Sequence, residues 1–490
     1  MIFNPALKPK GRKALPMSRL WATTAFALLL ASCAQMAPQA PALKAMDPSA
    51  LHLSNAQSPK ISETWWEGFQ NPDLSKLIEA SIQNNPSIAL ANTRIEKAQA
   101  LAGITRATSQ VQMNAGVDLD RQRFTQTGIY PPPLGGSMQT LSTLQLSGAW
   151  IPDVFGKYQA AYQSALGQVQ ASALEAIYVK TQLSSQIALQ FVGLAYSVDE
   201  RDLLLQRKKY VASLQHLLSE RVKAGLDASL DLKSLEIENN DLMNQLSQVN
   251  NQIDLYRNAL AALSAQSTAA LSSLTPHLRQ LQGIKMETQI GIDLLGRRAD
   301  VAAAKARVLA SLQSVEAAQL DFYPNLSLGF FAGYNSLTIN QLTRNSSAQY
   351  GVLPSLNLPI FDGGRLNAQL GAKSAERDQA ISMYNNTLLD AVKEASDALS
   401  TLQSTSTQLS SAQDSMKLAS ERLDIQTLKA KAGLSNQVSV LREALAQLQQ
   451  ERLYAQLHAK QLSSEVGLLK ALGAGGPDAV ERPHQLAQQP

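Results

Sequence analysis

The 490-residue sequence predicts a mainly helical protein with a smaller transmembrane β part, built by internal duplication. Three observations predict this fold. Proline is absent between Pro152 and Pro276 and again between Pro359 and Pro477, which leaves room for very long helices. Four short segments alternate between apolar and polar residues, as strands with two different faces do. Landmarks of the first half return in the second half at consistent spacing.

Composition supports helices and argues against a nucleic-acid partner. Aromatic residues make up only 5% of the chain, while the helix-compatible residues Ala, Leu, Ser and Gln are abundant. The formal charge is +4, but the first 32 residues carry five bases and no acid. Without these five, 38 Lys and Arg face 39 Asp and Glu, so the rest of the chain is nearly neutral. It lacks the basic stripe that nucleic-acid binding requires.

The N-terminus predicts a signal peptide and a lipid anchor. An apolar run between Leu20 and Leu30 follows the basic residues and is too short to span a bilayer. It ends in Leu30-Ala31-Ser32-Cys33, which resembles a bacterial lipobox, so we expect Cys33 to be acylated. The alternative is an ordinary signal peptide with an incidental cysteine. Translation could start at Met1 or at Met17, and the single cysteine excludes disulfides within the chain.

A repeated unit organises the rest of the chain. Residues 223–226 and 431–434 share the sequence Lys-Ala-Gly-Leu, 208 positions apart. Earlier landmarks such as Gly116 and Gly329 lie 213 positions apart, so a loop should absorb the difference of five. The predicted organisation is a signal peptide (1–32), a lipidated flexible tether (33–60), a first repeat (61–264), an equatorial linker (265–290), a second repeat (291–473) and a flexible tail (474–490).

Each repeat contributes two predicted strands, within residues 111–120 and 144–150 and then 326–334 and 355–360. Period-two alternation gives each strand one apolar face and one wet face. The apolar residues of the last strand would be Leu356, Leu358 and Ile360. The polar candidates for lining a pore are Asn114, Asp118, Asp120, Gln145, Ser147, Ser327 and Asn357.

The alternation alone fits a soluble sandwich as well as a membrane barrel, and favours the sandwich. Aromatic residues where strands meet helices favour the barrel, because aromatic belts mark membrane interfaces. Four strands cannot close a barrel, and open edges are not tolerated in lipid. Three subunits would together supply about twelve strands. The aromatic residues are Trp150, Phe155, Phe322, Tyr323 and Phe361.

The proline-free stretches predict helical hairpins that turn at Gly225 and Gly433. A helix from Tyr158 to Lys223 would be roughly 100 Å long at 1.5 Å per residue. Such a helix needs a partner, and apolar residues at heptad spacing predict antiparallel coiled-coil seams. The hairpins could be ordinary coiled coils or the wall of a tube. The proposed seam residues are Leu388, Ala395, Leu402, Leu409, Met416 and Leu423, paired with Leu434, Leu441, Leu448, Ala455, Leu462 and Leu469.

Several motifs resemble those of TolC-like outer-membrane efflux proteins of the NodT type. They are Trp65-Trp66-Glu67-Gly68-Phe69, the stretch from Leu294 to Val301, Phe322-Tyr323-Pro324-Asn325-Leu326, and Pro359 to Arg365. They occur in the family's order across residues 60–473. One departure is Ala299, where that family usually has proline, although Asp300 remains near the start of the helix.

The resemblance implies a trimer with a twelve-stranded barrel, a periplasmic helical tunnel and passive conduction of drugs or other small molecules. It also implies a periplasmic adaptor and an inner-membrane transporter, often of the resistance-nodulation-division class, as partners, with no cofactor besides the lipid on Cys33. An exit duct for protein secretion or metal export would use the same fold. A coiled-coil lipoprotein without a pore is a further alternative, against which the alternating strands argue.

In this family the Gly turns lie at the periplasmic tip, where acids after the second turn commonly narrow the pore. Here those positions hold Ser439 and Arg442, whereas the first hairpin keeps Asp231. We therefore expect Asp231 and Arg442, directly or through Ser435, to hold adjoining hairpins closed; the alternative is a set of solvated side chains.

Nothing in the sequence predicts an enzyme. The histidines at positions 52, 216, 277, 458 and 484 are scattered, and no metal or phosphate-binding motif accompanies them.

Overall fold

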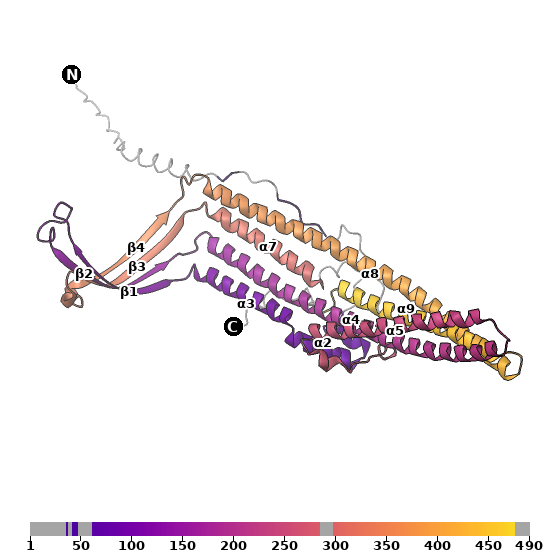
Figure 1. Cartoon of the computed structure of the whole chain (residues 1–490). Helices are drawn as coiled ribbons and strands as arrows, with labels where there is room; N and C mark the ends of the chain where they lie inside the picture. Colours follow the sequence, from indigo (N-terminus) through magenta and orange to yellow (C-terminus); the bar gives the residue numbers. More distant parts are fainter. Residues whose placement is uncertain (1–35, 38–41, 48–60, 285–296, 476–490) are drawn as a thin grey trace, which may run out of the picture. The chain divides into compact units, whose positions relative to one another are not determined.

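The computed structural model describes residues 36–37, 42–47, 61–284 and 297–475 (Figure 1). The predicted signal peptide, Cys33 and the end of the C-terminal tail lie outside the described residues, as do parts of the tether and of the linker. The chain divides into two compact units. We call residues 1–42, 101–165 and 309–379 the sheet unit, and residues 43–100, 166–308 and 380–490 the helical unit.

The described elements repeat with matching lengths, which confirms the duplication. The first repeat contains α2 (Pro72–Asn84), α3 (Pro86–Ala107), β1 (Gln112–Arg123), β2 (Met138–Trp150), α4 (Lys157–Lys223) and α5 (Ser229–Leu263). The second contains α7 (Ala299–Leu320), β3 (Asn325–Ser336), β4 (Ala348–Asn357), α8 (Arg365–Lys431) and α9 (Gln437–Ala471). Both α4 and α8 have 67 residues, and both α5 and α9 have 35.

Short 3-10 helices complete the described chain. They are η2 (Trp65–Phe69), η3 (Thr268–Leu271), η4 (Leu278–Gln280), η5 (Ile339–Gln341) and η6 (Asn345–Ser347). The offset between repeats is 213 residues at α3 and α7 but 208 at α4 and α8. It therefore changes within the strand hairpins and their connections, which agrees with the expectation of a loop difference.

The sheet unit holds one antiparallel four-stranded sheet in the order β1-β2-β3-β4 (Figure 1). Three strands cover their predicted segments, with boundaries that differ by a few residues. The prediction for the fourth strand was wrong at both ends, because β4 begins at Ala348 and ends at Asn357. Leu358 and Ile360 therefore follow the strand and are not part of its apolar face. At the helical ends of this unit, Val315 and Ala318 of α7 pack with Leu366 and Leu370 of α8.

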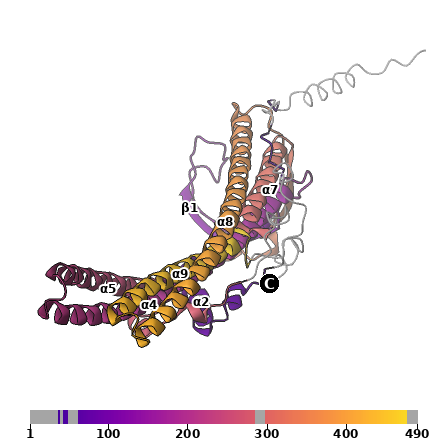
Figure 2. The same cartoon turned by 90° about the vertical axis from the view of Figure 1, so that its right-hand side faces the viewer.

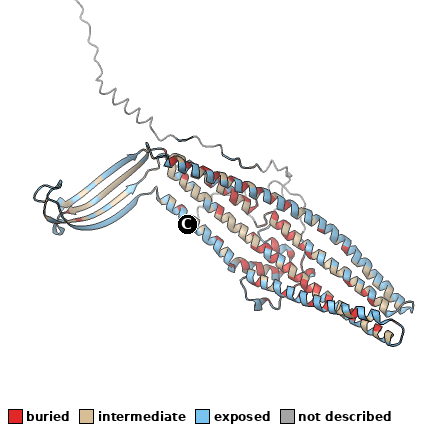
Figure 3. Cartoon of the chain, turned by 45° about the horizontal axis from the view of Figure 1, so that its top comes forward, coloured by how far each residue is buried: buried red, intermediate tan, exposed pale blue. Residues whose placement is uncertain are grey.

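The helical unit carries the main core of the described chain (Figure 3). Its buried centre includes Ile187, Phe191 and Leu194 of α4, none of which is measurably exposed. These pack with residues of η2, α2, α5 and α9. A partly buried ion pair crosses the unit, where Arg452 of α9 donates to Glu200 of α4 at 2.5 and 2.9 Å. Long helices thus gain the side-by-side partners that their length requires.

The coiled-coil seam of α8 and α9 is present but incomplete (Figure 2). Ala395 and Leu402 of α8 pack with Leu468 of α9, as the seam requires. Leu388 is instead buried against α7, and Leu441 and Leu462 of α9 join the main core of the helical unit. Leu434 does not belong to the seam, because it lies in the turn and is 80% exposed. Among the described residues, no helix has both the length and the apolar character needed to cross a bilayer.

The described part of the predicted tether is attached to α8. In the sheet unit, the Ala37 N–H donates to Asn367 at 2.8 Å. In the helical unit, the Met46 N–H donates to Asn385 at 2.8 Å, and the Asn385 amide donates to Lys44. The Met46 side chain packs on buried residues of α7 and α8. These contacts hold Ala37 and Met46 against α8, and the flexible tether over residues 33–60 stays a prediction.

The linker is held to the helical unit by polar contacts. The guanidinium of Arg257 donates to the Leu274 carbonyl at 3.0 Å. His277 Nδ1 donates to Asp199 at 2.6 Å, and the Ile284 N–H donates to Glu465 at 2.9 Å. The contacts of Leu274 and Ile284 satisfy backbone groups that a helix or sheet would otherwise pair.

Candidate functional site: sheet faces, strand–helix junctions and hairpin turns

The register of the sheet places every predicted pore-lining residue on one face, which we call the polar face. Asn114 lies opposite Ser147, and Gly116 opposite Gln145. Ser327 lies opposite Ser355, and Asn325 opposite Asn357. Directly opposed residues of antiparallel strands share a face, and alternation then places Asp118 and Asp120 there too.

Cross-strand hydrogen bonds link polar side chains on this face. The Gln349 amide donates to Gln145 at 3.2 Å, and the Asn335 amide donates to Thr143 at 2.9 Å. Asn114, Asp118, Asp120 and Asn357 are exposed, whereas Gln145, Ser147 and Ser327 are half-buried. The polar face can therefore meet water along all four strands.

The opposite face is apolar and has no cover within the described chain. Leu146 is 45% exposed, Val117 66% and Leu356 69%. This apolar face consists of Met113, Ala115, Val117, Leu119, Leu144, Leu146, Trp150, Leu326, Leu328, Phe330, Ala332, Tyr334, Tyr350, Val352, Pro354 and Leu356. Such an area left in water is large for a soluble monomer, and it predicts lipid or another protein as its neighbour.

Both edges of the sheet are open in this chain. β1 and β4 each pair on one side only, and no residue of β1 is buried. Open edges leave backbone N–H and C=O groups without a partner, which invites pairing with another chain.

Phe331 is a residue of the polar face that the alternation did not identify. It pairs with Ser147 and Gly351, both on that face. A Cβ added at Gly351 would lie 2.7 Å from the Phe331 ring, so the ring occupies the space that the glycine leaves. Its signal in the sequence was the Phe330-Phe331 pair, which breaks the strict alternation of β3.

Four of the five predicted belt aromatics are exposed at the ends of strands or beyond them. Trp150 is 41% exposed, Phe155 45%, Tyr323 49% and Phe361 90%. Phe322 is a correction, because it is only 7% exposed and packs with Leu366 and Leu370 of α8. The Phe322 ring is buried in the contact between α7 and α8 and is not available at the surface.

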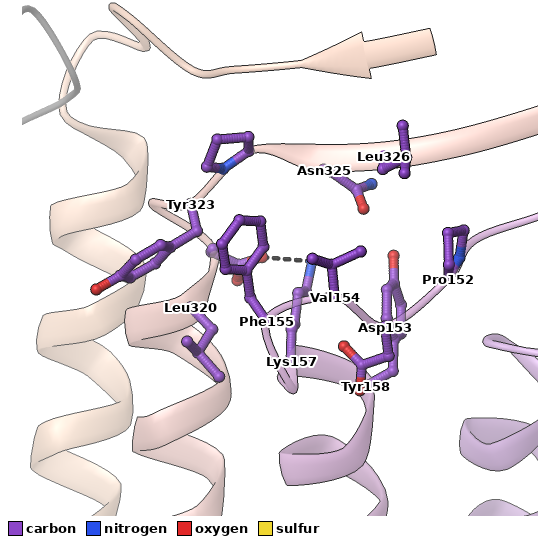
Figure 4. Close-up of a pocket in the computed structure, with 12 residues that line it drawn as sticks. Pro152, Asp153, Val154, Phe155, Lys157, Tyr158, Leu320, Tyr323, Asn325 and Leu326 are labelled. Carbon is purple, nitrogen blue, oxygen red and sulfur yellow. Dashed lines mark ion pairs between the residues drawn. The ribbon is translucent and has the colours of Figure 1, made fainter. Parts of the chain in front are cut away.

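A small pocket lies in the sheet unit where β2 leads into α4 and α7 leads into β3 (Figure 4). Lys157 forms an ion pair with Asp321 across it, with Nζ 2.5 Å from Oδ1. The rings of Phe155 and Tyr323 lie 5.4 Å apart beside it. Asp153 accepts from the Gln159 N–H at 2.7 Å and so satisfies a free donor in the first turn of α4.

Both predicted hairpin turns are confirmed. Gly225 and Gly433 have φ of 72° and 76°, a left-handed conformation that glycine adopts without steric cost. The Leu226 N–H donates to the Arg221 carbonyl, and the Leu434 N–H donates to the Lys429 carbonyl. This bonding is the Schellman pattern of helix C-termini.

The gate candidates occupy the helical unit, but the described contacts differ from the expected pair. Asp231 lies exposed in the first turn of α5, and Arg442 is exposed on α9. Among the described residues, no ion pair joins them. At the turn of the first hairpin, the guanidinium of Arg221 instead donates two hydrogen bonds to the carboxylate of Asp227, with N–O distances of 2.5 and 3.0 Å.

The hydrogen bonds from Arg221 lower the pKa of Asp227 below its ordinary value, and the charge of Arg442 adds to this effect. Arg442 therefore acts on a different acid of the first hairpin than the sequence suggested. Asp227 was missed because the comparison of repeats aligned Asp231, and not Asp227, with an expected acidic position.

The gate candidates Ser435 and Ser439 form hydrogen bonds within the second hairpin. Ser435 is half-buried and accepts from the Gln426 amide at 2.6 Å. The Ser439 N–H donates to Asn436 at 2.9 Å, which makes Asn436 the N-cap of α9. The second turn is thus closed by neutral hydrogen bonds, where the first turn uses an ion pair.

Asp300 keeps the role expected for it at the start of α7. Arg298, whose side chain is 5% exposed, donates to Asp300 at 2.7 Å and to Glu394 of α8 at 2.9 Å. It also donates to the Ala471 carbonyl at the end of α9. Ala299 is buried beside this group, so the departure from proline leaves the helix start anchored.

Two of the histidines are less scattered than their sequence positions suggested. His277 binds Asp199, and the same carboxylate acts electrostatically on His458. Burial lowers the pKa of His458, whose ring stacks on Tyr454. Among residues 36–37, 42–47, 61–284 and 297–475, no group of three acidic, histidine or cysteine side chains could hold a metal ion.

Comparison with known proteins gives consistent matches. The profile of the family described as outer membrane efflux protein matches residues 77–266 and 292–474. The chain is 27% identical over 440 residues to multidrug resistance outer membrane protein MdtP of Escherichia coli O157:H7, covering 87% of this chain and 88% of that protein. It is 29% identical over 389 residues to MdtQ of the same organism, covering 77% and 81%.

The fold also matches a solved structure. The outer membrane protein VceC of Vibrio cholerae aligns with a TM-score of 0.77 and 26% identity. The alignment covers 84% of this chain and 99% of that protein.

Proposed function

Because this chain belongs to the outer membrane efflux protein family, we propose that it forms the outer-membrane channel of an efflux system and passively conducts drugs or other small molecules. The observation that carries this proposal is the sheet, with one apolar face, one polar face and two open edges. In a lipid bilayer the apolar face is covered by lipid and the polar face lines water.

The open edges support a homotrimer. If β1 of one subunit pairs with β4 of the next, three copies close a barrel of about twelve strands and leave no edge in the bilayer. The helical hairpins would then form a tunnel in the periplasm. Phe331 would stand among polar residues on the lumen side and narrow the barrel there.

The hairpin turns supply a surface for a partner. Leu226, Leu230 and Leu434 are 67%, 73% and 80% exposed at or beside the turns. Apolar side chains at the tips of helical hairpins fit an adaptor that brings helices of its own. Energy would come from an inner-membrane transporter that this adaptor connects to the channel.

The same turn region is the proposed gate, formed by Asp231, Ser435, Ser439 and Arg442 together with Asp227. Closure requires groups that hold neighbouring hairpins together and that a partner can displace. The charge of Arg442 contributes to the lowered pKa of Asp227, which supports the inclusion of both residues.

A covalent lipid on Cys33 would add a second attachment to the outer membrane. This part rests on the sequence Leu30-Ala31-Ser32-Cys33. Cells fed labelled palmitate should incorporate it into the wild type and not into Cys33→Ser. We expect part of the Cys33→Ser protein to stay in the membrane, because the barrel buries more apolar area than the acyl chains. A wild type without label would exclude the lipid anchor.

The channel itself is tested by reconstitution. Purified full-length protein should migrate as a trimer and produce stepwise conductance in a planar bilayer, while protein from strains that lack the gene should produce none. A stable trimer that inserts and never conducts would favour a coiled-coil lipoprotein without a pore.

A further inference from the structure

The pocket at the strand–helix junction belongs to the sheet unit, whereas the gate candidates belong to the helical unit. Pro152, Val154 and Phe155 line it from the connection between β2 and α4, and Tyr323 and Leu326 line it from the segment that follows α7 (Figure 4). It has a volume of about 40 Å³ and opens at the surface of the sheet unit. It can therefore hold a small polar group whose remainder lies outside.

The pocket is lined by one cation, Lys157, and by two acids, Asp153 and Asp321. Lys157 and Asp321 occupy helix ends that do not favour their charges. Lys157 is the first residue of α4, where the positive end of the helix dipole disfavours a cation. Asp321 directly follows α7, where the negative end disfavours an anion. Their side chains stay 35% and 18% exposed, so both charges can be reached from outside.

Apolar side chains beside the charges continue onto the apolar face of the sheet. Val154 is 61% exposed, and the exposed Phe155 and Tyr323 rings lie against each other. Leu326 lines the pocket and also lies on the apolar face, one alternation before Leu328. A ligand with a charged end in the pocket could therefore run its apolar part along this face.

We propose that this pocket binds the headgroup of a phosphoethanolamine lipid, with the phosphate at Lys157 and the ammonium at Asp321. The acyl chains then lie along Phe155, Tyr323 and Leu326. The proposal rests on the proposed function, because only a barrel brings this face to lipid. Two new charge-assisted contacts replace the single ion pair, and a primary ammonium can donate hydrogen bonds to the carboxylate.

Headgroup chemistry distinguishes this ligand from other membrane lipids. A phosphocholine headgroup carries no N–H and cannot donate to Asp321. A phosphoglycerol headgroup has no cation at all. The site should therefore prefer the primary amine, whereas an apolar groove alone would take all three lipids equally.

The second repeat does not duplicate this pair of charges. Arg365 occupies the position that corresponds to Lys157, 208 residues later, and binds Gln369. The position that corresponds to Asp321 is Thr108, whose hydroxyl donates to the Ile104 carbonyl. These two positions adjoin β4 and β1, the opposite edges of the sheet. Gln369 also donates to Asp321, so Arg365 is connected to the pocket and cannot serve as its control.

The test uses the purified full-length channel, stripped of lipid and then mixed with equal amounts of phosphatidylethanolamine, phosphatidylcholine or phosphatidylglycerol of identical chains. Native mass spectrometry counts the lipids bound per chain. We expect the wild type to prefer phosphatidylethanolamine by about tenfold, which corresponds to one charge-assisted hydrogen bond. Asp321→Asn should remove this preference, and Lys157→Gln should weaken the binding of all three lipids. Arg344→Gln removes an exposed cation of the sheet unit that does not line the pocket, and as the control it should change the binding of none.

Equal binding of the three lipids by the wild type would overturn the proposal, and that comparison needs no variant to fold. An unchanged preference in Asp321→Asn would overturn it too. Soluble glycerophosphoethanolamine carries the same headgroup without acyl chains and is added at a concentration equal to that of the lipid. If it fails to displace the bound lipid, the acyl chains contribute to binding. If it displaces the lipid fully, a contribution of the acyl chains is excluded. Conductance of the same wild-type sample separates the two failures. A conducting trimer without headgroup preference discards only the pocket ligand, whereas trimers that never conduct discard the channel.

Discussion

The strands of the sheet unit and the helices of the helical unit both contain strongly patterned apolar residues, yet only the helices bury these residues within the chain. All twelve residues of β1 are exposed. In the helical unit, Ile187, Phe191 and Leu194 are fully enclosed by other helices of the same chain. Figure 3 shows this difference between the exposed strands and the buried helix interiors.

Periodicity therefore predicts which face of an element avoids water, but it does not predict which other segment or medium covers that face. The apolar faces of the helices are covered within the chain, because each hairpin and the linker place other segments beside them. The apolar face of the strands has no such cover, because the four strands form an open sheet and no second layer of the described chain packs against it. In the proposed channel, lipid covers the apolar face and further copies of the chain pair with the edges.

The largest expected effect is in the core of the helical unit. Phe191→Ala should lower the free energy of unfolding by about 3–5 kcal/mol, because it leaves a cavity in a fully enclosed site. Chemical unfolding followed by circular dichroism measures it. Val117→Ala, at a β1 position that is 66% exposed, is the control and should leave the helical transition unchanged. An equal loss in both variants would remove the contrast between the units.

The next effect separates the two faces of the sheet. Leu146→Arg or Leu328→Arg should reduce the yield of assembled trimer, since an arginine facing lipid at mid-membrane costs roughly 2–4 kcal/mol. Gln145→Arg and Ser327→Arg, on the polar face of the same strands, should be tolerated better. Trimer yield is measured on unheated gels of membrane fractions. Equal yields for both sets would reject the barrel.

The sequence predicted the elements whose signals are local. The two 67-residue helices follow from proline-free stretches, and the faces of β1 and β3 follow from alternation. The start of β4 was missed because Gly351 and Pro354 weaken its strand signal. Proline is nonetheless acceptable there, since β4 is an edge strand.

The site residues that sequence reasoning misplaced depend on contacts between distant segments. Phe322 looks like its belt neighbour Tyr323 until α8 places Leu366 and Leu370 against it. Asp227 gains its partner only because the turn at Gly225 brings it back to Arg221. The pocket of Lys157 and Asp321 joins residues far apart in the chain, and no spacing rule connects them.

A smaller effect is expected from two titratable groups on α9 with opposite pH dependence. Burial lowers the pKa of His458 below its ordinary value of 6.5. The unfolded chain then takes up more protons as the pH falls through this range, so His458 makes the protein less stable in acid. His458→Gln should reduce the loss of thermal stability between about pH 7 and pH 5.

Glu465 provides the opposite sign. Burial raises its pKa above the ordinary value of 4.5, although the Ile284 N–H and Gln461 partly offset this. The folded state then binds a proton more readily than the unfolded state as the pH falls, so Glu465 favours folding in acid. Glu465→Gln should raise the melting temperature near pH 7, and the gain should shrink toward pH 5. Parallel pH profiles for the wild type and both variants would show that neither group titrates with folding.

The smallest effect is expected at the hairpin turns, where the charges are exposed and water weakens their interaction. Arg442→Gln should raise the open probability of single channels slightly, because it removes a charge that links two hairpins. Asp227→Asn and Asp231→Asn test which of the two acids interacts with Arg442. If Asp227→Asn reproduces the effect and adds nothing to Arg442→Gln, the link is the one within a chain. The same pattern for Asp231→Asn would place the link between adjoining hairpins of different subunits. Ser439→Ala is the control, since its backbone N–H still binds Asn436. Unchanged conductance in every variant would leave the apolar contacts around Leu441, buried on α9 beside the turn, as the closure.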